Sequence, residues 1–526
     1  MKWPFSKNKR DYPADRFSAD YIEAILKDMD KYELTRIPAI FVLLLTSSDK
    51  LKSRTANVLA KYVTELNMNE LTKLDALFRE RTTLDWSIDW RNEHPESLLL
   101  PNMTEEQRVV ILGLCSFHPN GYFREKAVAL LDQYSSGKEW PYLLLRCNDW
   151  VEEVREAAEK CVEQRLKQPY ISEIISSLPL IFKWKNKNNH IFQQAAQVLA
   201  QPEVYPFLEE GTRLKDRGTR YYCYQMIVHT KLFNKEVLLN YYKVEKDPYS
   251  RLFLFNELVS NLSVYEFKEF YPILKKDKFP FIRLKVLEKF HTYFQDASLS
   301  ELENALFDKS STIRILARFL LEKLDTSIVF SRFYIDRLNS NRNVRESLLG
   351  IGETGRKEHA QITLPFLHNS NIGISKAAIH ALSMLDGEKQ KLEFVHLLQS
   401  EQQGISKAAR KAIELLHYHD LKDQLYDIYK ETSHEHTKYN IALLLCSLPK
   451  WEAIIYIIKF YVDTESRDVS KLAMANILKW IEQYNRSFET PSTEQINALR
   501  TLLSKHRNKF QYEEDKAIEF SMKGFL

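Results

Sequence analysis

Three groups of residues in this sequence have types and spacings that could perform chemistry. In the first group, Gly350, Gly352 and Gly355 fit the G-x-G-x-x-G pattern of dinucleotide-binding loops. That pattern binds a dinucleotide where a strand leads into it and a helix opens at it. A helical pattern, Val344 to Ile351, precedes it instead. We therefore expect these glycines to form a tight helix end at a repeat boundary, with glycine supplying a left-handed cap.

The second group could hold a metal ion, because four histidines and two carboxylates fall within 20 residues: His417, His419, His434, His436, Asp420 and Glu435. Two histidines in a His-x-His pair on a helix point some 200° apart, since each residue turns the helix by about 100°. That geometry suits joint ligation poorly. We expect surface histidines near a turn, with a metal site as the open alternative.

The third group lies between residues 181 and 300, which hold 19 basic and 13 acidic side chains and 23 of the 64 aromatic residues. Basic and aromatic side chains together can contact phosphates and stack on bases, or bind a protein partner. Aromatic residues at helical spacing are also commonly core residues. The candidate partner-binding residues of this group are Trp184, Lys185, Lys187, Arg217, Arg220, Tyr221 and Tyr222.

Other functional classes have little support in the sequence. It contains no P-loop, H-E-x-x-H or nucleophile-elbow signature, so we predict a protein that is not an enzyme and uses no cofactor or metal. The net charge of +4 is too small to indicate nucleic-acid binding. Five scattered cysteines, no apolar leader and no early apolar run longer than Ala39–Leu45 predict a cytoplasmic protein without a membrane span.

A repeated phrase shows which elements must position these residues. An aliphatic or aromatic residue, often followed by Arg or Lys, recurs with a small or apolar residue four places on, as in Val154–Ala158 and Ile313–Ala317, and other copies follow the phrase more loosely. Its first residue serves as the anchor of each copy. The anchors fall at 123, 154, 191, 219, 250, 282, 313, 344, 374, 405, 437 and 469. Most gaps are 30 to 32 residues, which indicates a repeat array.

Each repeat should be a helical hairpin. From the anchor, apolar residues continue at helical spacing, as in Ile313, Ala317, Leu320 and Leu324, which predicts a helix with one buried face. A unit of about 31 residues leaves room for a turn and a shorter partner helix. One hairpin cannot bury both its faces, so neighbours must stack. The predicted fold is all-α, an α-α superhelix of about twelve hairpins.

Polar residues five places before the anchor should cap the second helix of each hairpin, namely Asp149, Asp277, Asp308, Asn339 and Asn369. We expect Asp149 to pair with Arg155, Asp277 with Arg283, and Asp308 with Arg314 across the turn. These residues resemble the Asp and Arg of HEAT repeats, in which they form a structural ladder along the stack. The short unit is similar to the bacterial repeats named after phycobilisome lyases. The resemblance covers roughly residues 118–485 and implies a fold rather than a function.

The array divides the chain into three predicted parts: a helical N-terminal capping region with one degenerate repeat (1–117), the solenoid (118–486) and a helical C-terminal cap (487–526). The 37-residue gap between anchors 154 and 191 carries an insertion, placed at Lys183–His190. Insertions in solenoids map to loops on one face, often the binding face.

Three functions are compatible with these observations. The first is a scaffold that binds another protein or peptide on its concave face, most simply as a monomer. The second is nucleic-acid binding through residues 181–300. The third is lyase or chaperone action on a tetrapyrrole-bearing protein, which only the resemblance implies. We favour the scaffold.

Overall fold

The computed structural model describes residues 12–27, 34–80, 88–183, 190–230, 234–463, 465–483, 488–506, 509, 516 and 518–520. These residues form α-helices joined by turns and short 3₁₀ segments, and no strand occurs among them. The all-α prediction is therefore confirmed. None of the described helices combines the length and hydropathy needed to cross a lipid bilayer.

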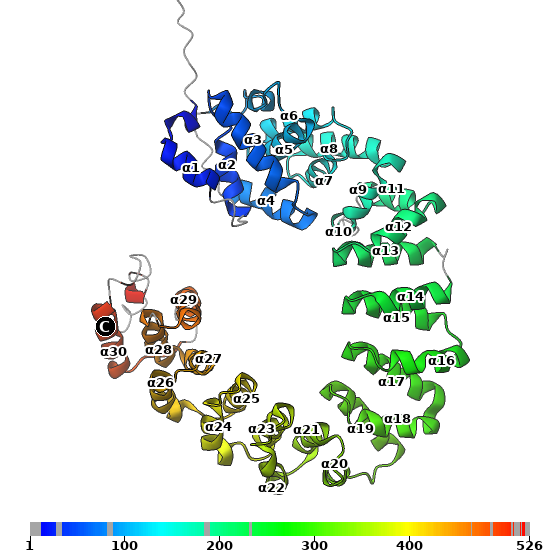
Figure 1. Ribbon diagram of the computed structural model, residues 1–526, viewed down its shortest axis with the longest axis vertical. Coiled ribbons are helices and arrows are strands. Elements are labelled where there is room, and N and C mark those ends of the chain that lie inside the picture. The colour runs from blue at the N-terminus through cyan, green and yellow to red at the C-terminus, as the bar shows by residue number, and fades with distance from the viewer. Residues whose placement is uncertain are drawn as a thin grey trace, which may run out of the picture. The chain divides into compact units, whose positions relative to one another are not determined.

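The chain forms two compact units, Met1–Phe267 and Lys268–Leu526, and α16 (Val264–Leu274) contains the boundary. The first unit is a succession of packed helices (Figure 1). They are α1 (Ala19–Lys27), α2 (Ile37–Val42), α3 (Asp49–Val63), α4 (Met68–Glu80), α5 (Glu105–Cys115), α6 (Gly121–Leu131), α7 (Trp140–Arg146), α8 (Glu152–Arg165), α9 (Ile171–Ser176), α10 (Leu178–Lys183), α11 (His190–Leu199), α12 (Tyr205–Gly211), α13 (Arg217–Thr230), α14 (Lys235–Val244) and α15 (Pro248–Ser260).

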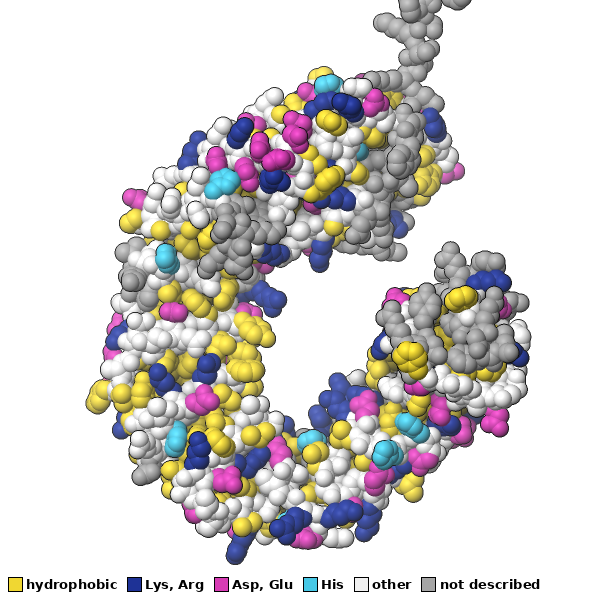
Figure 2. Space-filling view, turned by 180° about the vertical axis from the view of Figure 1, so that it is seen from behind, with side chains coloured by type: hydrophobic (Ala, Val, Ile, Leu, Met, Phe, Trp, Pro, Cys, Tyr) yellow, Lys and Arg dark blue, Asp and Glu magenta, His cyan; other side chains and the backbone are white. Residues whose placement is uncertain are grey.

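The second unit continues the same hairpin pattern. Its helices are α17 (Pro280–Phe294), α18 (Leu299–Ala305), α19 (Ser311–Leu324), α20 (Phe330–Asn339), α21 (Val344–Thr354), α22 (Ala360–Thr363), α23 (Ile372–Asp386), α24 (Lys391–Leu398), α25 (Gln403–Ile413), α26 (Lys422–Glu431), α27 (Glu435–Cys446), α28 (Lys450–Val462), α29 (Arg467–Glu482) and α30 (Thr493–His506). Within this unit, α19, α21, α23, α25 and α27 line the concave side, and α18, α20, α24 and α26 lie outside them (Figure 1). Lys and Arg side chains gather on that inner side around α25 (Figure 2).

The predicted hairpins are confirmed at every anchor. All twelve anchors lie in the first turns of a helix, namely α6, α8, α11, α13, α15, α17, α19, α21, α23, α25, α27 and α29. Each of these helices is the second of its hairpin. Nine anchors are buried, whereas Val344, Ile374 and Ile405 are only half-buried. In α23 and α25 the residue after the anchor, Ser375 or Ser406, is fully buried, so the buried face is shifted by one position.

Stacking buries the apolar faces in a core that continues from hairpin to hairpin inside each unit. In the second unit α23 packs against α21 and α25, and α27 against α25 and α29. Leu382 and Ile413 are among the fully buried side chains at these contacts. Each such side chain contributes about 1.5–3 kcal/mol relative to an exposed one.

Arginine–carboxylate pairs join successive hairpins, which corrects the predicted pairing within one hairpin. Arg283 donates two hydrogen bonds, of 2.9 and 2.7 Å, to the Asp308 carboxylate of the next hairpin. To its own Asp277 it donates only at the backbone carbonyl, at 2.7 Å. Arg155 and Arg314 likewise reach the carbonyls, not the carboxylates, of Asp149 and Asp308.

The reason lies in the helix-start geometry of the acidic residue. Asp308 Oδ1 accepts the backbone N–H of Ser310, two residues on, at 2.7 Å, and this turn holds both carboxylate oxygens toward Arg283 of the preceding hairpin. Because a guanidinium has five N–H donors, the arginine binds a carbonyl of its own hairpin and the carboxylate of the next hairpin at the same time. The same arrangement joins Arg124 to Asp149 and Arg220 to Glu245, each 25 residues apart. Leu180 stands 25 residues after Arg155, so this rung lacks a carboxylate.

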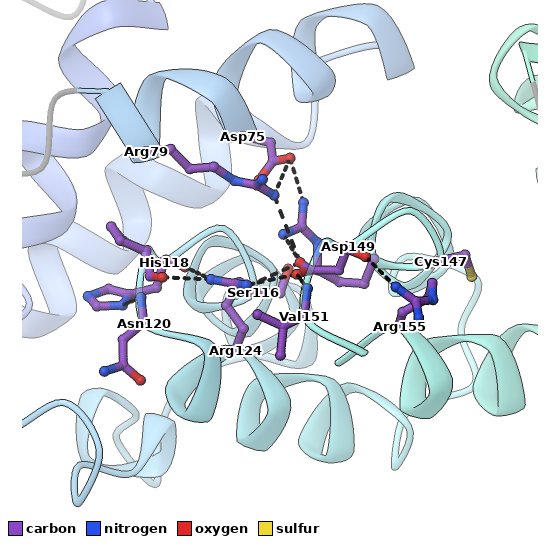
Figure 3. A network of polar contacts seen from close by, with 12 residues as sticks. Asp75, Arg79, Ser116, His118, Asn120, Arg124, Cys147, Asp149, Val151 and Arg155 are labelled. Atoms are coloured by element: carbon purple, nitrogen blue, oxygen red, sulfur yellow. Dashed lines mark hydrogen bonds and ion pairs between the residues drawn. The ribbon is translucent and has the colours of Figure 1, made fainter. Parts of the chain in front are cut away.

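The Arg124–Asp149 rung is the centre of a buried charged network (Figure 3). Arg146 donates to Asp149 at 2.8 Å and also pairs with Asp75 at 2.5 Å. Burial alone would raise the pKa of Asp149, but the Arg124 hydrogen bond and the Arg146 charge outweigh it and hold the pKa below its ordinary value. Removing one member would leave an unpaired charge in the interior, so the network fixes how these hairpins meet.

His118 is a buried neutral histidine next to this network. Its ring lies 4.2 Å from the Trp90 ring and 5.0 Å from the Phe123 ring, centroid to centroid, and its backbone carbonyl accepts a hydrogen bond from Arg124. Burial, and then the Arg124 charge, lowers its pKa to about 3.

We predict that this histidine makes the protein less stable in mild acid. Between about pH 6.5 and pH 5 the unfolded chain binds a proton at His118 that the folded chain does not, so stability falls as the pH falls. The change His118→Gln should flatten that part of the curve in urea unfolding followed by circular dichroism. His417→Gln, at an exposed position, is the control. Identical pH dependence in His118→Gln and the parent protein would contradict this assignment.

Candidate partner-binding surfaces

The predicted aromatic site of the first unit is a half-buried strip rather than an open groove. Tyr222 stacks on Phe182 of α10 with ring centroids 4.2 Å apart, and Tyr221 meets Phe253 of α15 edge-on at 5.5 Å. Burial raises the pKa of Tyr222, and Tyr221 adds to that shift. These contacts hold the rings mainly against the protein and leave their edges at the surface.

The basic residues predicted beside the rings have different surroundings. Arg220 is committed to the Glu245 carboxylate by two hydrogen bonds of 2.9 Å. Arg217 leaves 77% of its side chain exposed, with the nearest Asp247 oxygen at 3.9 Å. Trp184, Lys185 and Lys187 lie outside the described residues. The structure thus brings Arg217, Tyr221 and Tyr222 together on α13 and assigns Arg220 to the ladder.

A larger concave feature lies in the second unit, where the second helices α23, α25, α27 and α29 run side by side. Two adjacent hollows, of about 830 and 690 Å³, share Lys407 as a wall. Together we call them the lysine groove. Its lining includes Lys376, His380, Lys407, Arg410, Lys411, Glu414, Leu415, Glu435, Tyr439, Leu443, Asp468, Lys471 and Leu472.

Four cations of the groove are available to a partner. Lys376, Lys407, Lys411 and Lys471 form no ion pair with any residue that the structure describes. The acidic lining is partly used: Glu414 pairs with Arg410 on the same helix, and Glu435 accepts the Ser466 hydroxyl at 2.6 Å. The lysines are therefore the groove's main unused charges.

A change of residue type in the ladder, from arginine to serine, accompanies the exposed Lys376 and Lys407. In α23 and α25 serine occupies the position that holds arginine in most of the earlier repeats, and its buried hydroxyl donates to a carbonyl at the end of the preceding helix. The Ser375 bond to Leu367 is 2.5 Å and the Ser406 bond to Leu398 is 2.7 Å. Small alanines follow on the packed side, and the intervening Lys376 and Lys407 are exposed.

Sequence reasoning missed this groove, although a signal was present. The segment Ile374-Ser375-Lys376-Ala377-Ala378 is repeated letter for letter at 405–409, and Val469-Ser470-Lys471 shares its Ser-Lys pair. Each copy fits the general anchor pattern, which by itself predicts only one more packing repeat. Only the three-dimensional stack shows that the lysines share one face.

The glycine motif belongs to packing. Gly350 and Gly352 lie inside α21, where a Cβ on Gly350 would come 2.3 Å from the Tyr334 ring and one on Gly352 would come 2.7 Å from the Ala381 backbone. The helix does end here, at Thr354, but Gly355 has φ −79°. The predicted left-handed cap is therefore wrong, because the chain leaves α21 in an extended conformation.

The four histidines lie in two groups along the chain, one just before α26 and the other at the start of α27. His417 and His419 are exposed, and the rings of His434 and His436 stack at an angle of 23° with their centroids 5.5 Å apart. His436 contacts the Ser400 carbonyl through Nε2 at 2.9 Å. Across the described part of the chain, no three His, Cys, Asp or Glu side chains converge as a metal site would require.

Comparison with known proteins gives only weak structural similarities. No family model and no curated protein sequence matches the chain. Among solved structures, importin beta is 10% identical, with 96% of this chain and 69% of that chain covered and a TM-score of 0.32. The karyopherin Kap121p bound to the SUMO protease Ulp1p is 9% identical, with coverages of 94% and 64% and a TM-score of 0.31. At such low identities and scores these similarities say nothing about function.

The two arginines of α13 should respond differently to truncation. Arg220→Ala should lower the free energy of unfolding by about 2–4 kcal/mol, because the buried Glu245 carboxylate loses its partner. Arg217→Ala should change it by less than about 0.5 kcal/mol, as is usual for surface positions. Urea unfolding of both variants checks this. A smaller effect for Arg220→Ala than for Arg217→Ala would contradict the ladder role of Arg220.

Proposed function

We propose that this protein is a binding scaffold that holds a segment of another protein in the lysine groove. The observation that carries the proposal is the groove itself: two adjoining hollows on the second helices, lined by four lysines that have no ion-pair partner among the described residues. Exposed apolar side chains lie among them, including Leu415 at 62% exposure and Tyr439 at 38%. Apolar contact combined with unused charge is typical of protein-binding surfaces.

The stacked architecture supports this role. Side chains at one position of each repeat form a row along consecutive second helices, so a long partner can contact several repeats at once. Buried polar contacts beneath the groove hold the rows in place: the Asn440 amide donates to the Ser406 hydroxyl at 2.9 Å. The groove is thus carried by rigid helices rather than by loops, which reduces the entropy lost on binding.

Nucleic-acid binding is the weaker alternative. A phosphate backbone places a negative charge at every nucleotide, and Glu414, Glu435 and Asp468 would repel part of it. In the first unit, Arg220 is already neutralised by Glu245. We propose Arg217, Tyr221 and Tyr222, with Trp184, Lys185 and Lys187, as a second protein-contact region.

We further propose a cytoplasmic monomer. The five cysteines are free thiols, four of them buried, as expected in a reducing compartment.

Photo-crosslinking in the native cell tests the scaffold directly. A photoreactive phenylalanine analogue in place of Tyr439 should capture a protein, whereas the same analogue at the exposed Leu392 of α24 is the control. The double variant Lys407→Glu/Lys411→Glu should reduce capture about tenfold or more, because favourable charges become repulsive. Lys389→Glu, at an exposed lysine in the short 3₁₀ segment between α23 and α24 and outside the groove lining, should leave it unchanged. Equal capture at both sites, or a nuclease-sensitive product, would contradict the proposal.

A further inference from the structure

The groove's charges repeat with the period of the stack. Lys376 of α23, Lys407 of α25 and Lys471 of α29 each stand two residues after the anchor of their repeat. In α27 the corresponding residue is Tyr439, so an aromatic ring interrupts the lysine row at its third position. Lys411 lies one helical turn after Lys407 and adds a second cation to that repeat.

This spacing matches an extended peptide. Packed helices lie about 8–10 Å apart, and a peptide in the extended polyproline II conformation advances about 3.1 Å per residue with three residues per turn. Three residues of such a peptide therefore span one repeat, and every third side chain lies on the same face. A carboxylate at every third residue would meet one lysine after another, while the residue opposite Tyr439 would meet a ring.

The apolar lining favours a peptide over a uniform polyanion. Leu443 and Leu472 lie beside Tyr439 in the same hollow, which suits an apolar side chain at the third position. Asp468 and Glu435 flank that place and disfavour negative charge there. The lining that faces the peptide is thus mainly basic at α23 and α25, whereas basic and acidic side chains lie together at α27 and α29.

We propose that the lysine groove recognises an extended acidic segment of a partner protein, with carboxylates at about every third residue and an apolar residue opposite Tyr439. This inference rests on the proposed function and defines the chemistry of its partner. Lys376, Lys407, Lys411 and Lys471 supply the attraction, and the interruption at Tyr439 sets the register.

Fluorescence anisotropy with the full chain tests the register. The probe is a labelled peptide with glutamates at every third position and a leucine in place of the third glutamate. Its isomer has the same composition but adjacent glutamates. We expect the spaced peptide to bind about tenfold more tightly than the isomer, and Lys407→Glu/Lys411→Glu to weaken it about tenfold or more. Lys389→Glu should leave the affinity unchanged.

Other outcomes would overturn the inference. Equal binding of the two peptides would show that the groove does not recognise the spacing of the carboxylates. Tighter binding of a single-stranded oligothymidine, with a steep salt dependence, would show that the groove binds nucleic acid and not an acidic peptide. If neither peptide binds while crosslinking at Tyr439 still depends on Lys407 and Lys411, the acidic-peptide inference fails and the scaffold proposal stands. If crosslinking also fails, both fall.

Discussion

A helical hairpin of about 31 residues can bury one face against itself and needs a neighbour to bury the other. Every other feature of this protein depends on that constraint. Apolar side chains at the anchor positions provide the contact, but they do not fix how one hairpin sits on the next. The arginine–carboxylate rungs do, because each guanidinium binds both a carbonyl of its own hairpin and a carboxylate of the following one.

The ladder also determines where the molecule can bind. Where arginine occupies the rung, as at Arg283, its charge is paired with a carboxylate of the neighbouring hairpin. In α23 and α25 a serine hydroxyl satisfies one carbonyl instead, and the basic residue beside it faces solvent. In these repeats the positive charge is therefore on the exposed lysine, whereas in the arginine rungs it is inside the stack. The lysine groove lies where the array uses serine at this position.

The fold was predictable because helical periodicity and the repeat length are local properties of the sequence. Anchors such as Ile282 and Ile313 are buried as expected. The pairing of Arg283 was not predictable, because its own Asp277 is nearer in sequence than Asp308 and only the stack shows which carboxylate it meets. The groove was missed for the same reason: Lys376, Lys407 and Lys471 are 31 and 64 residues apart and share a face only after stacking.

The central claim is that cross-hairpin rungs are cooperative contacts between repeats. A double-mutant cycle on Arg283→Ala and Asp308→Ala, measured by urea unfolding, tests it most directly. Because both side chains are partly exposed, we predict a coupling free energy of about 1 kcal/mol, with the double variant less destabilised than the sum of the single variants. Effects that add to within about 0.3 kcal/mol would show that the rung does not link the two hairpins.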